Sequence, residues 1–173
     1  EEHRPEIEAD QYGDANAILV LSPSVTAATL GDPSDLLAIG RYGVGYDTVD
    51  VPACTEADVL LCISKGAVDR PVAEATIGWM IALTHNMRVK DGLVRTGEWD
   101  ARTNHMGCEI RERTFGAVGL GGISRETIRL LSGFGMNPPI AFDPFVSKAD
   151  AAEMGVELVE LEDLMGRADF VSV

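Results

Sequence analysis

Residues 115–124 read FGAVGLGGIS, an apolar run that leads directly into a glycine-rich turn. Residues 114–118 are short and apolar, which predicts a buried strand, and residues 123–134 carry an apolar stripe at helical spacing. A strand that turns through glycines into a helix presents the free N–H groups and partial positive charge of the helix N-terminus. The stretch therefore predicts an anion site at the start of this helix.

The spacing of the glycines, and of an acid further on, indicates a dinucleotide as the anion. We expect Gly119 to make the tight turn off the strand and Gly121 to let the backbone approach a pyrophosphate. Asp143 lies 22 residues after Gly121, at the end of the next predicted strand. Its carboxylate would accept hydrogen bonds from ribose hydroxyls and repel a 2′-phosphate, which favours NAD over NADP. Ser124 replaces the third glycine, which predicts slightly wider helix–strand packing without loss of binding. The alternative, that these residues only make two tight turns, leaves their combination unexplained.

Apolar runs on both sides of this unit extend the pattern of strand and helix. The remaining predicted strands are residues 15–21, 36–39, 59–63, 139–142, 156–159 and 170–173, and the short helices are 25–30, 53–57, 148–154 and 161–165. Near-continuous apolar strands alternating with helices are typical of parallel sheets covered on both faces, so the fold class is α/β. Ligands collect at the carboxyl ends of such strands, which places residues 41–47 and 64–67 at a potential site.

A long helix is predicted from Pro71 to Met87, because proline suits a first helical turn and apolar residues follow at helical spacing. Its apolar residues lie on more than one face, which predicts burial on several sides as a core helix; a subunit interface or an interdomain spine is the alternative. Gly78 would allow a neighbour to approach closely. Residues 91–112 are polar, and we expect one or two helical turns followed by a surface loop.

Composition excludes several classes of protein. The 173 residues include 14 basic and 28 acidic side chains, giving a net charge of −14, with 46% hydrophobic residues. This length suits one domain or two small ones. Such an acidic chain repels phosphate backbones, so nucleic acid and anionic membranes are poor partners. No apolar run approaches the roughly 18 residues that a membrane span needs. The acidic first residues predict a solvated segment.

Cysteines and isolated acids give no independent catalytic signal. Cys54, Cys62 and Cys108 are odd in number and form no C-x-x-C, which predicts reduced thiols in a cytoplasmic protein. Cys62 is expected in the core, and Cys108 has no histidine nearby to make it a nucleophile. Asp47 and Asp50 are expected to cap turns and helix starts. The histidines and cysteines lack metal-ligand spacing, so no zinc or iron site is predicted.

Residues 39–50, IGRYGVGYDTVD, resemble the signature of the NAD-dependent D-isomer-specific 2-hydroxyacid dehydrogenases, which include D-3-phosphoglycerate dehydrogenase-like enzymes. The resemblance covers nearly the whole chain in the family's order. It also includes residues 71–78, 92–99, 114–123, 134–136 and 142–144. It implies a partial flavodoxin-like substrate domain over residues 1–67 and a partial Rossmann NAD-binding domain over residues 68–173, with the active site in the cleft between them.

The resemblance also implies the binding residues. Backbone N–H groups of the loop Tyr42, Gly43, Val44 and Gly45 would hold the substrate carboxylate, in agreement with glycines that expose N–H groups to an anion. Cofactor-binding positions are Val72, near the nicotinamide, together with Gly119, Gly121, Gly122, Ile123 and Asp143. The family dimerises through the cofactor domain, so a homodimer is expected.

Catalytic residues are not matched within this sequence. The family uses an Arg to orient the substrate, a His to take the hydroxyl proton and a Glu to tune that His, and all three lie beyond the position of Val173. His85 and His105 are expected in the long helix and the surface loop, so neither is assigned as the base. The chain ends inside the apolar run 170–173, with nothing to pair or cover it, which predicts that the sequence is part of a longer protein.

Lys65 departs from the family pattern, in which many members carry a Thr-Pro-like pair before the glycine that matches Gly66. Its ammonium could pair with a second anionic group of the substrate or with a cofactor phosphate; a solvated loop lysine is the alternative. The predicted function is hydride transfer between NAD(H) and a D-2-hydroxy acid/2-oxo acid pair. A regulatory, corepressor-like protein of the same fold, which senses NAD without catalysis, is the second hypothesis.

Overall fold

The computed structural model describes residues 4–31 and 35–173, so Glu1 and Glu2 of the acidic start lie outside the described residues. The chain divides into two compact units, unit 1 over Glu1–Val68 and unit 2 over Asp69–Val173. No helix in the described part of the chain is both long and apolar enough to cross a membrane. Both units are built on parallel sheets, which confirms the α/β class.

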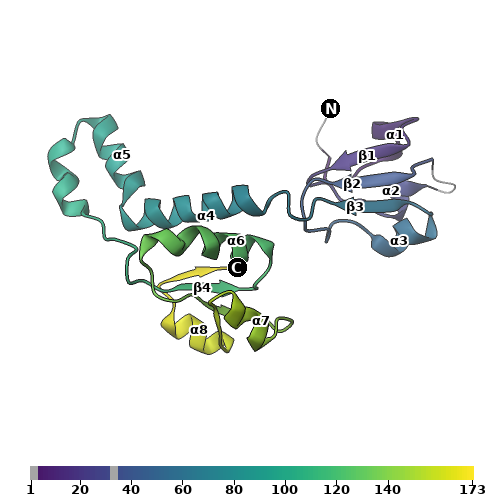
Figure 1. Ribbon diagram of the computed structural model, residues 1–173. Helices are drawn as coiled ribbons and strands as arrows, with labels where there is room; N and C mark the ends of the chain where they lie inside the picture. Colours follow the sequence, from purple (N-terminus) through teal and green to yellow (C-terminus); the bar gives the residue numbers. More distant parts are fainter. Residues whose placement is uncertain (1–3, 32–34) are drawn as a thin grey trace. The chain divides into compact units, whose positions relative to one another are not determined.

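Unit 1 is a three-stranded parallel sheet in the order β1-β2-β3, with short helices between the strands (Figure 1). Its elements are α1 (Ala9–Tyr12), β1 (Ala17–Val20), α2 (Ala27–Leu30), β2 (Ala38–Arg41), α3 (Val51–Glu56) and β3 (Leu60–Ile63). The core joins Val20 and Ile39 of the sheet to Leu30 of α2 and Cys54 of α3. Asp50 caps α3 by accepting a 3.0 Å hydrogen bond from the Ala53 N–H, as predicted.

The second face of this sheet is open, contrary to the prediction that both faces are covered. Leu19, Gly40 and Cys62 stand in register on neighbouring strands. Leu19 is 83% exposed and Cys62 is also exposed, so the prediction of Cys62 in the core is wrong. Successive side chains of a strand point to opposite faces, and among the described residues α2 and α3 pack only on the face of Val20 and Ile39.

Unit 2 contains a four-stranded parallel sheet in the order β6-β5-β4-β7. Its strands are β4 (Phe115–Val118), β5 (Ile140–Phe142), β6 (Glu157–Leu158) and β7 (Phe170–Ser172), and the helices that connect them are α6 (Gly122–Leu131), continued by the 3₁₀ turn η2 (Ser132–Phe134), α7 (Lys148–Glu153) and α8 (Leu161–Arg167). β7 pairs with β4, Phe170 opposite Phe115, so the prediction that nothing pairs the end of the chain is wrong.

The long helix α4 (Asp69–Thr84) lies along α6 (Figure 1). Its buried stripe is Ala73, Ile77 and Met80. The other apolar side is exposed, with Trp79 at 67% and Leu83 at 73%, so the prediction of burial on several sides is wrong for the described residues. Nothing in the described residues lies within 4 Å of a Cβ placed on Gly78, so no close neighbour explains that glycine.

An ion pair joins the start of α4 to α6. Arg70 contacts Glu126 at 3.2 Å while also pairing with Glu74. Arg129 and Arg70 together lower the pKa of Glu126 to about 2. The glycine-rich turn therefore lies at the start of a helix that is held against α4.

The predicted long helix breaks at Asn86, which adopts a left-handed conformation with φ of 52°. Asparagine tolerates this conformation better than most residues. Its side-chain amide also donates a 3.2 Å hydrogen bond to the Met106 carbonyl. The chain beyond the break forms α5 (Met87–Thr96) and the 3₁₀ helix η1 (Trp99–His105), so this region is more helical than predicted.

Candidate nucleotide and carboxylate sites

The glycine-rich turn leaves β4 and opens α6, as the sequence predicts. Gly119 has φ of +94°, a conformation that glycine adopts at little cost, and its N–H donates a 2.8 Å hydrogen bond to the Phe142 carbonyl at the end of β5. Gly121 is the N-cap residue of α6 and no side chain caps this helix. The turn is thus fixed at one end to β5 and open at the start of the helix.

The first turn of α6 offers a row of unused hydrogen-bond donors. The N–H groups of Gly122, Ile123 and Ser124 meet no acceptor within the described part of the chain. A Cβ added at Gly121 would find nothing within 4 Å, so open space faces this part of the turn. Free N–H groups and the helix dipole together suit a phosphate group. The residues present therefore fit the diphosphate of a dinucleotide.

Asp143 connects the end of β5 to the turn. Its Oδ2 accepts a 2.7 Å hydrogen bond from the Leu120 N–H, and its Oδ1 accepts bonds of 2.8 and 3.2 Å from the Phe145 and Val146 N–H groups. The Leu120 bond, followed by the other two, lowers the pKa of the Asp143 carboxyl below its ordinary value. A carboxylate oxygen has two lone pairs, so Oδ2 retains capacity for a ribose hydroxyl.

The loop after β2 is the corresponding feature of unit 1. Tyr42 donates its N–H to the Val20 carbonyl at 2.8 Å, and the Gly43 carbonyl accepts a 2.9 Å bond from the Ser64 N–H after β3. Gly43 has φ of +146°. The next N–H groups, those of Val44 and Gly45, have no acceptor among the described residues, and both residues are exposed. This arrangement suits a small anion such as a carboxylate.

Two cations stand at the same edge of unit 1. Arg41 ends β2, and its guanidinium lies beside Gly43, donating a 2.6 Å bond from Nη1 to the Tyr42 carbonyl. Its Nε is buried with no hydrogen-bond partner in the described structure. Lys65 follows β3 and is exposed. The sequence predicts Arg41 as the first residue of the potential site at residues 41–47, but assigns its side chain no role.

No sequence motif assigns Asp69 to a site. It is the first residue of α4, and a Cβ placed on Gly122 would overlap its carboxyl group, lying 2.7 Å from Cγ and 2.9 Å from Oδ1. Its carboxylate therefore rests against the first residue of α6. Val72, on the next part of α4, is 38% exposed and belongs to the same unit as the turn.

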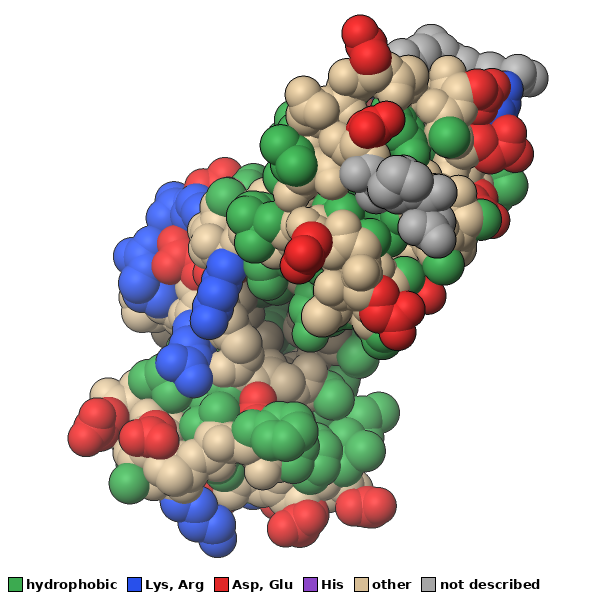
Figure 2. Space-filling view, turned by 90° about the vertical axis from the view of Figure 1, so that its right-hand side faces the viewer, with side chains coloured by type: hydrophobic (Ala, Val, Ile, Leu, Met, Phe, Trp, Pro, Cys, Tyr) green, Lys and Arg blue, Asp and Glu red, His purple; other side chains and the backbone are tan. Residues whose placement is uncertain are grey.

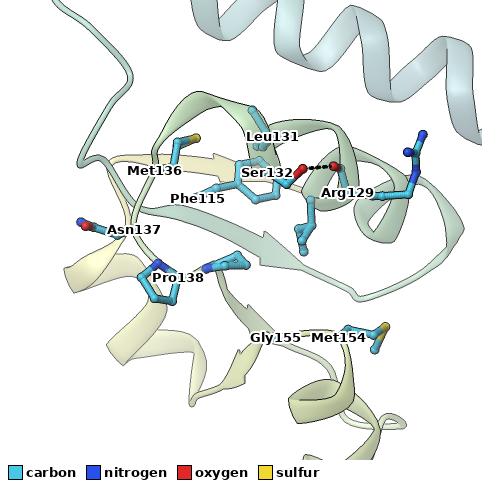
Figure 3. Close-up of a pocket in the computed structure, with 11 residues that line it drawn as sticks. Phe115, Arg129, Leu131, Ser132, Met136, Asn137, Pro138, Met154 and Gly155 are labelled. Atoms are coloured by element: carbon cyan, nitrogen blue, oxygen red, sulfur yellow. Dashed lines mark hydrogen bonds between the residues drawn. The ribbon is translucent and has the colours of Figure 1, made fainter.

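A cavity of about 440 Å³ lies elsewhere in unit 2 (Figure 3). Its lining includes Phe115 at the start of β4, Pro138 and Pro139 before β5, and Met154 after α7. It lies at the amino ends of the strands, whereas the glycine-rich turn follows the carboxyl end of β4. The cavity is therefore separate from the candidate nucleotide site.

Metal and thiol chemistry find no support in the described residues. No group of three or more His, Cys, Asp or Glu side chains there could hold a metal ion. Cys54 is buried, and burial raises the pKa of its thiol, which keeps it protonated. Cys62 and Cys108 are exposed and free.

Known proteins similar to this chain include an NAD-binding family whose match contains the glycine-rich turn. The family described as D-isomer specific 2-hydroxyacid dehydrogenase, NAD binding domain, matches residues 77–173. A D-3-phosphoglycerate dehydrogenase of Methanocaldococcus jannaschii is 38% identical over 166 residues, covering 95% of this chain and 31% of the relative. A glyoxylate reductase structure from Paecilomyes thermophila has 28% identity and a TM-score of 0.78, covering 94% of this chain and 51% of that one. The Escherichia coli D-lactate dehydrogenase structure has 26% identity and a TM-score of 0.75, covering 94% and 52%.

The chain belongs to the D-isomer specific 2-hydroxyacid dehydrogenase family, and its cofactor is NAD. The matched segment contains the glycine-rich turn and Asp143 but not the loop of unit 1. The chain spans about a third of the length of the Methanocaldococcus jannaschii relative and about half of each of the two solved chains.

Proposed function

We propose that the whole protein is an oxidoreductase that transfers a hydride between NAD(H) and a D-2-hydroxy acid/2-oxo acid pair. The observation that carries this proposal is the row of unused N–H groups at Gly122, Ile123 and Ser124, with the Asp143 carboxylate beside the turn. The relatives named above are dehydrogenases and a reductase, which favours an enzyme over a regulatory protein that only senses NAD.

Each part of the chain has a distinct role in this proposal. The turn 119–123 binds the diphosphate, the Asp143 carboxylate accepts hydrogen bonds from the ribose hydroxyls, and Val72 lies near the nicotinamide. Bound NAD supplies the acceptor for the hydride that leaves C2 of the hydroxy acid. The hydroxyl proton passes to a base, and the Arg, Glu and His that the family uses have no match within these 173 residues.

In the same proposal, the loop Tyr42, Gly43, Val44 and Gly45 binds the substrate carboxylate. Its support is the pair of exposed, unused N–H groups at Val44 and Gly45. The backbone of Gly43, which precedes these two residues, is itself held in place. Its N–H donates a 2.9 Å hydrogen bond to the Arg41 carbonyl, and its carbonyl accepts one from the Ser64 N–H. An oriented carboxylate fixes the position of the adjoining C2, which is the carbon that must face the nicotinamide.

The test is turnover of purified full-length protein, followed at the absorbance band of the reduced nicotinamide. NADH is supplied with glyoxylate, hydroxypyruvate, pyruvate and longer 2-oxo acids, and NAD with 3-phosphoglycerate. We expect oxidation of NADH with at least one 2-oxo acid, or reduction of NAD with 3-phosphoglycerate, and much slower reaction with the phosphorylated cofactors. Turnover with NADP(H) but not NAD(H) would contradict the role given to Asp143.

Lys65 is assigned to a second anionic group of the substrate. Residues 1–68 contain three basic side chains, Arg4, Arg41 and Lys65. Arg4 pairs with Glu8 and Asp10, while Arg41 and Lys65 make no ion pair among the described residues. An otherwise acidic unit thus keeps its unpaired cations at the ends of β2 and β3, next to the proposed carboxylate loop. The D-3-phosphoglycerate dehydrogenase relatives act on a substrate with such a second anion.

Replacement of this lysine tests the assignment. Lys65→Ala should raise the substrate KM at least several-fold, because a charge-assisted contact with the second anion is lost. Arg111→Ala, at an exposed position ahead of β4, removes the same charge and should leave KM unchanged. An unaltered KM for Lys65→Ala across a panel of hydroxy acids would remove Lys65 from the site.

A homodimer through unit 2 is the proposed assembly. Its support is the exposure of apolar side chains from α4 to the end of η1: Trp79, Leu83, Val94, Trp99 and Met106 are each more than half exposed. Large apolar patches of this kind are typical of protein interfaces. We also propose a cytoplasmic location, because the three cysteines are free and thiols stay reduced in the cytoplasm.

A further inference from the structure

The Asp69 carboxylate lies at the start of α6, where the proposed function places the diphosphate of the cofactor. It rests against Gly122, the first residue of α6, and a Cβ at that glycine would overlap the carboxyl group. Without a ligand, a carboxylate beside a helix N-terminus is favourable, because it faces the positive end of the helix dipole. The same position suits a phosphate group for the same reason.

The charge of Asp69 is not neutralised by its neighbours. The Asp69 carboxylate has no hydrogen-bond or ion-pair partner among the described residues. The adjoining cation, Arg70, is already engaged by Glu74 at 2.5 Å and by Glu126 at 3.2 Å. Glu126 is itself paired with Arg129 at 2.7 Å. The first turn of α6 therefore faces an unpaired carboxylate rather than a salt bridge.

We propose that Asp69 limits the affinity of this protein for NAD by repelling the diphosphate at the first turn of α6. The inference rests on the cofactor site proposed above and adds a residue that opposes binding there. Asp69 must turn away from Gly122, or remain close to a doubly charged group, when the dinucleotide is bound. Both outcomes cost free energy that a neutral side chain would not cost.

The test compares dissociation constants for NADH, measured by ligand fluorescence, in wild-type protein, Asp69→Asn and Asp69→Ala. We expect both variants to bind NADH about fivefold more tightly at low salt, and we expect this difference to shrink toward about 1 M salt, where the Debye length falls to about 3 Å. Glu153→Gln is the matched control: it removes one exposed acid at the end of α7, ahead of β6, and should leave the affinity unchanged.

Ligand fragments separate repulsion of the diphosphate from a general effect of charge. ADP-ribose, which carries the diphosphate, should show the same tightening as NADH, whereas adenosine, which carries no phosphate, should show none. Equal affinities of wild type and Asp69 variants for NADH would overturn this inference and leave the proposed function standing. Weaker binding by both variants, or equal tightening for adenosine, would also overturn it. No NADH binding by any of the proteins would overturn both proposals.

Discussion

Individual glycines in the turn are retained for different physical reasons. Gly119 has a positive φ, while Gly121 has an ordinary extended conformation with open space where a Cβ would stand. The fold alone therefore does not explain a glycine at position 121. The approach of a ligand to the backbone does explain it.

Gly121→Ala should accordingly damage binding and spare the fold. A methyl group in the open space beside the first turn of α6 blocks the approach of the diphosphate, so we expect the NADH dissociation constant to rise at least about tenfold, or about 1.4 kcal/mol. The unfolding free energy should change by less than about 0.5 kcal/mol. Ligand fluorescence and urea unfolding measure the two quantities. Gly133→Ala, also with nothing within 4 Å, should affect neither, and a Gly121→Ala protein that binds NADH normally would contradict the assignment.

Asp143 gives a prediction about pH because three backbone N–H groups stabilise its charged form. Its folded pKa is lowered, so its contribution to stability is present above the unfolded pKa and is lost as pH falls through the folded value. Asp143→Asn should reduce the unfolding free energy by about 1–2 kcal/mol at about pH 7, and the difference from wild type should shrink below about pH 4.

Urea unfolding at a series of pH values measures this difference. Asp100→Asn, at an exposed position in η1, should show little difference from wild type at any pH. A constant gap between Asp143→Asn and wild type down to about pH 3 would show that the hydrogen bonds do not depend on the charge of Asp143.

At the scale of elements, packing of α8 against β4 depends on a glycine. A Cβ at Gly116 of β4 would lie 2.7 Å from the Ala168 Cβ and 3.0 Å from Leu164 of α8. Gly166, within α8, has nothing within 4 Å of its Cβ position. The same substitution at these two positions should therefore change stability in opposite directions.

Gly116→Ala should lower the unfolding free energy by about 1–3 kcal/mol, because the added methyl group overpacks the contact with α8. Gly166→Ala should raise it by about 0.5 kcal/mol, because alanine favours the helix. Urea unfolding of both variants provides the comparison. A Gly116→Ala protein as stable as wild type would mean that α8 can shift away from β4 at no cost.

Sequence patterns predicted the elements that local chemistry determines. The apolar run into the glycine turn located β4 and α6, and Asp50 was correctly predicted to cap α3. The break at Asn86 escaped prediction, since the apolar spacing continues across it and the left-handed conformation depends on the distant carbonyl of Met106. The exposure of Cys62 escaped prediction because an apolar strand does not reveal how many of its faces are covered.

The residues of the candidate site also differ in how far the sequence could predict them. Glycine spacing and the acid at position 143 are local signals, so the sequence predicted the turn between β4 and α6 and the acid after β5, while the binding of a nucleotide there stays a prediction. Asp69 carries no such local signal, because its place beside the turn depends on a tertiary contact with Gly122. No spacing rule connects positions 69 and 122.

The charge and the exposed apolar side chains of the whole molecule indicate which kinds of partner it can bind. The net charge of −14 disfavours nucleic acid, while Figure 2 shows hydrophobic side chains exposed among acidic ones on one face. Trp79 and Leu83 lie one helical turn apart on α4, and no helix or strand in the described part of the chain covers them. We take these two side chains as the centre of the proposed dimer contact.

Leu83→Glu should convert a dimer into a monomer, because a charge buried without a partner is costly in an apolar interface. Light scattering after gel filtration measures the mass. Met165→Glu, at a comparably exposed position of α8, should leave the mass unchanged. If wild type is a monomer, or if Leu83→Glu remains a dimer, the proposed interface is wrong.

In the proposed complex, the diphosphate of NAD lies on the backbone N–H groups that open α6, and the ribose contacts Asp143. A crystal structure of the protein with NAD bound tests this arrangement most directly. We predict diphosphate oxygens within hydrogen-bond distance of the Gly122 and Ile123 N–H groups and a ribose hydroxyl on Asp143 Oδ2. NAD bound elsewhere, with no ligand at the glycine-rich turn, would show that this turn is not the diphosphate site.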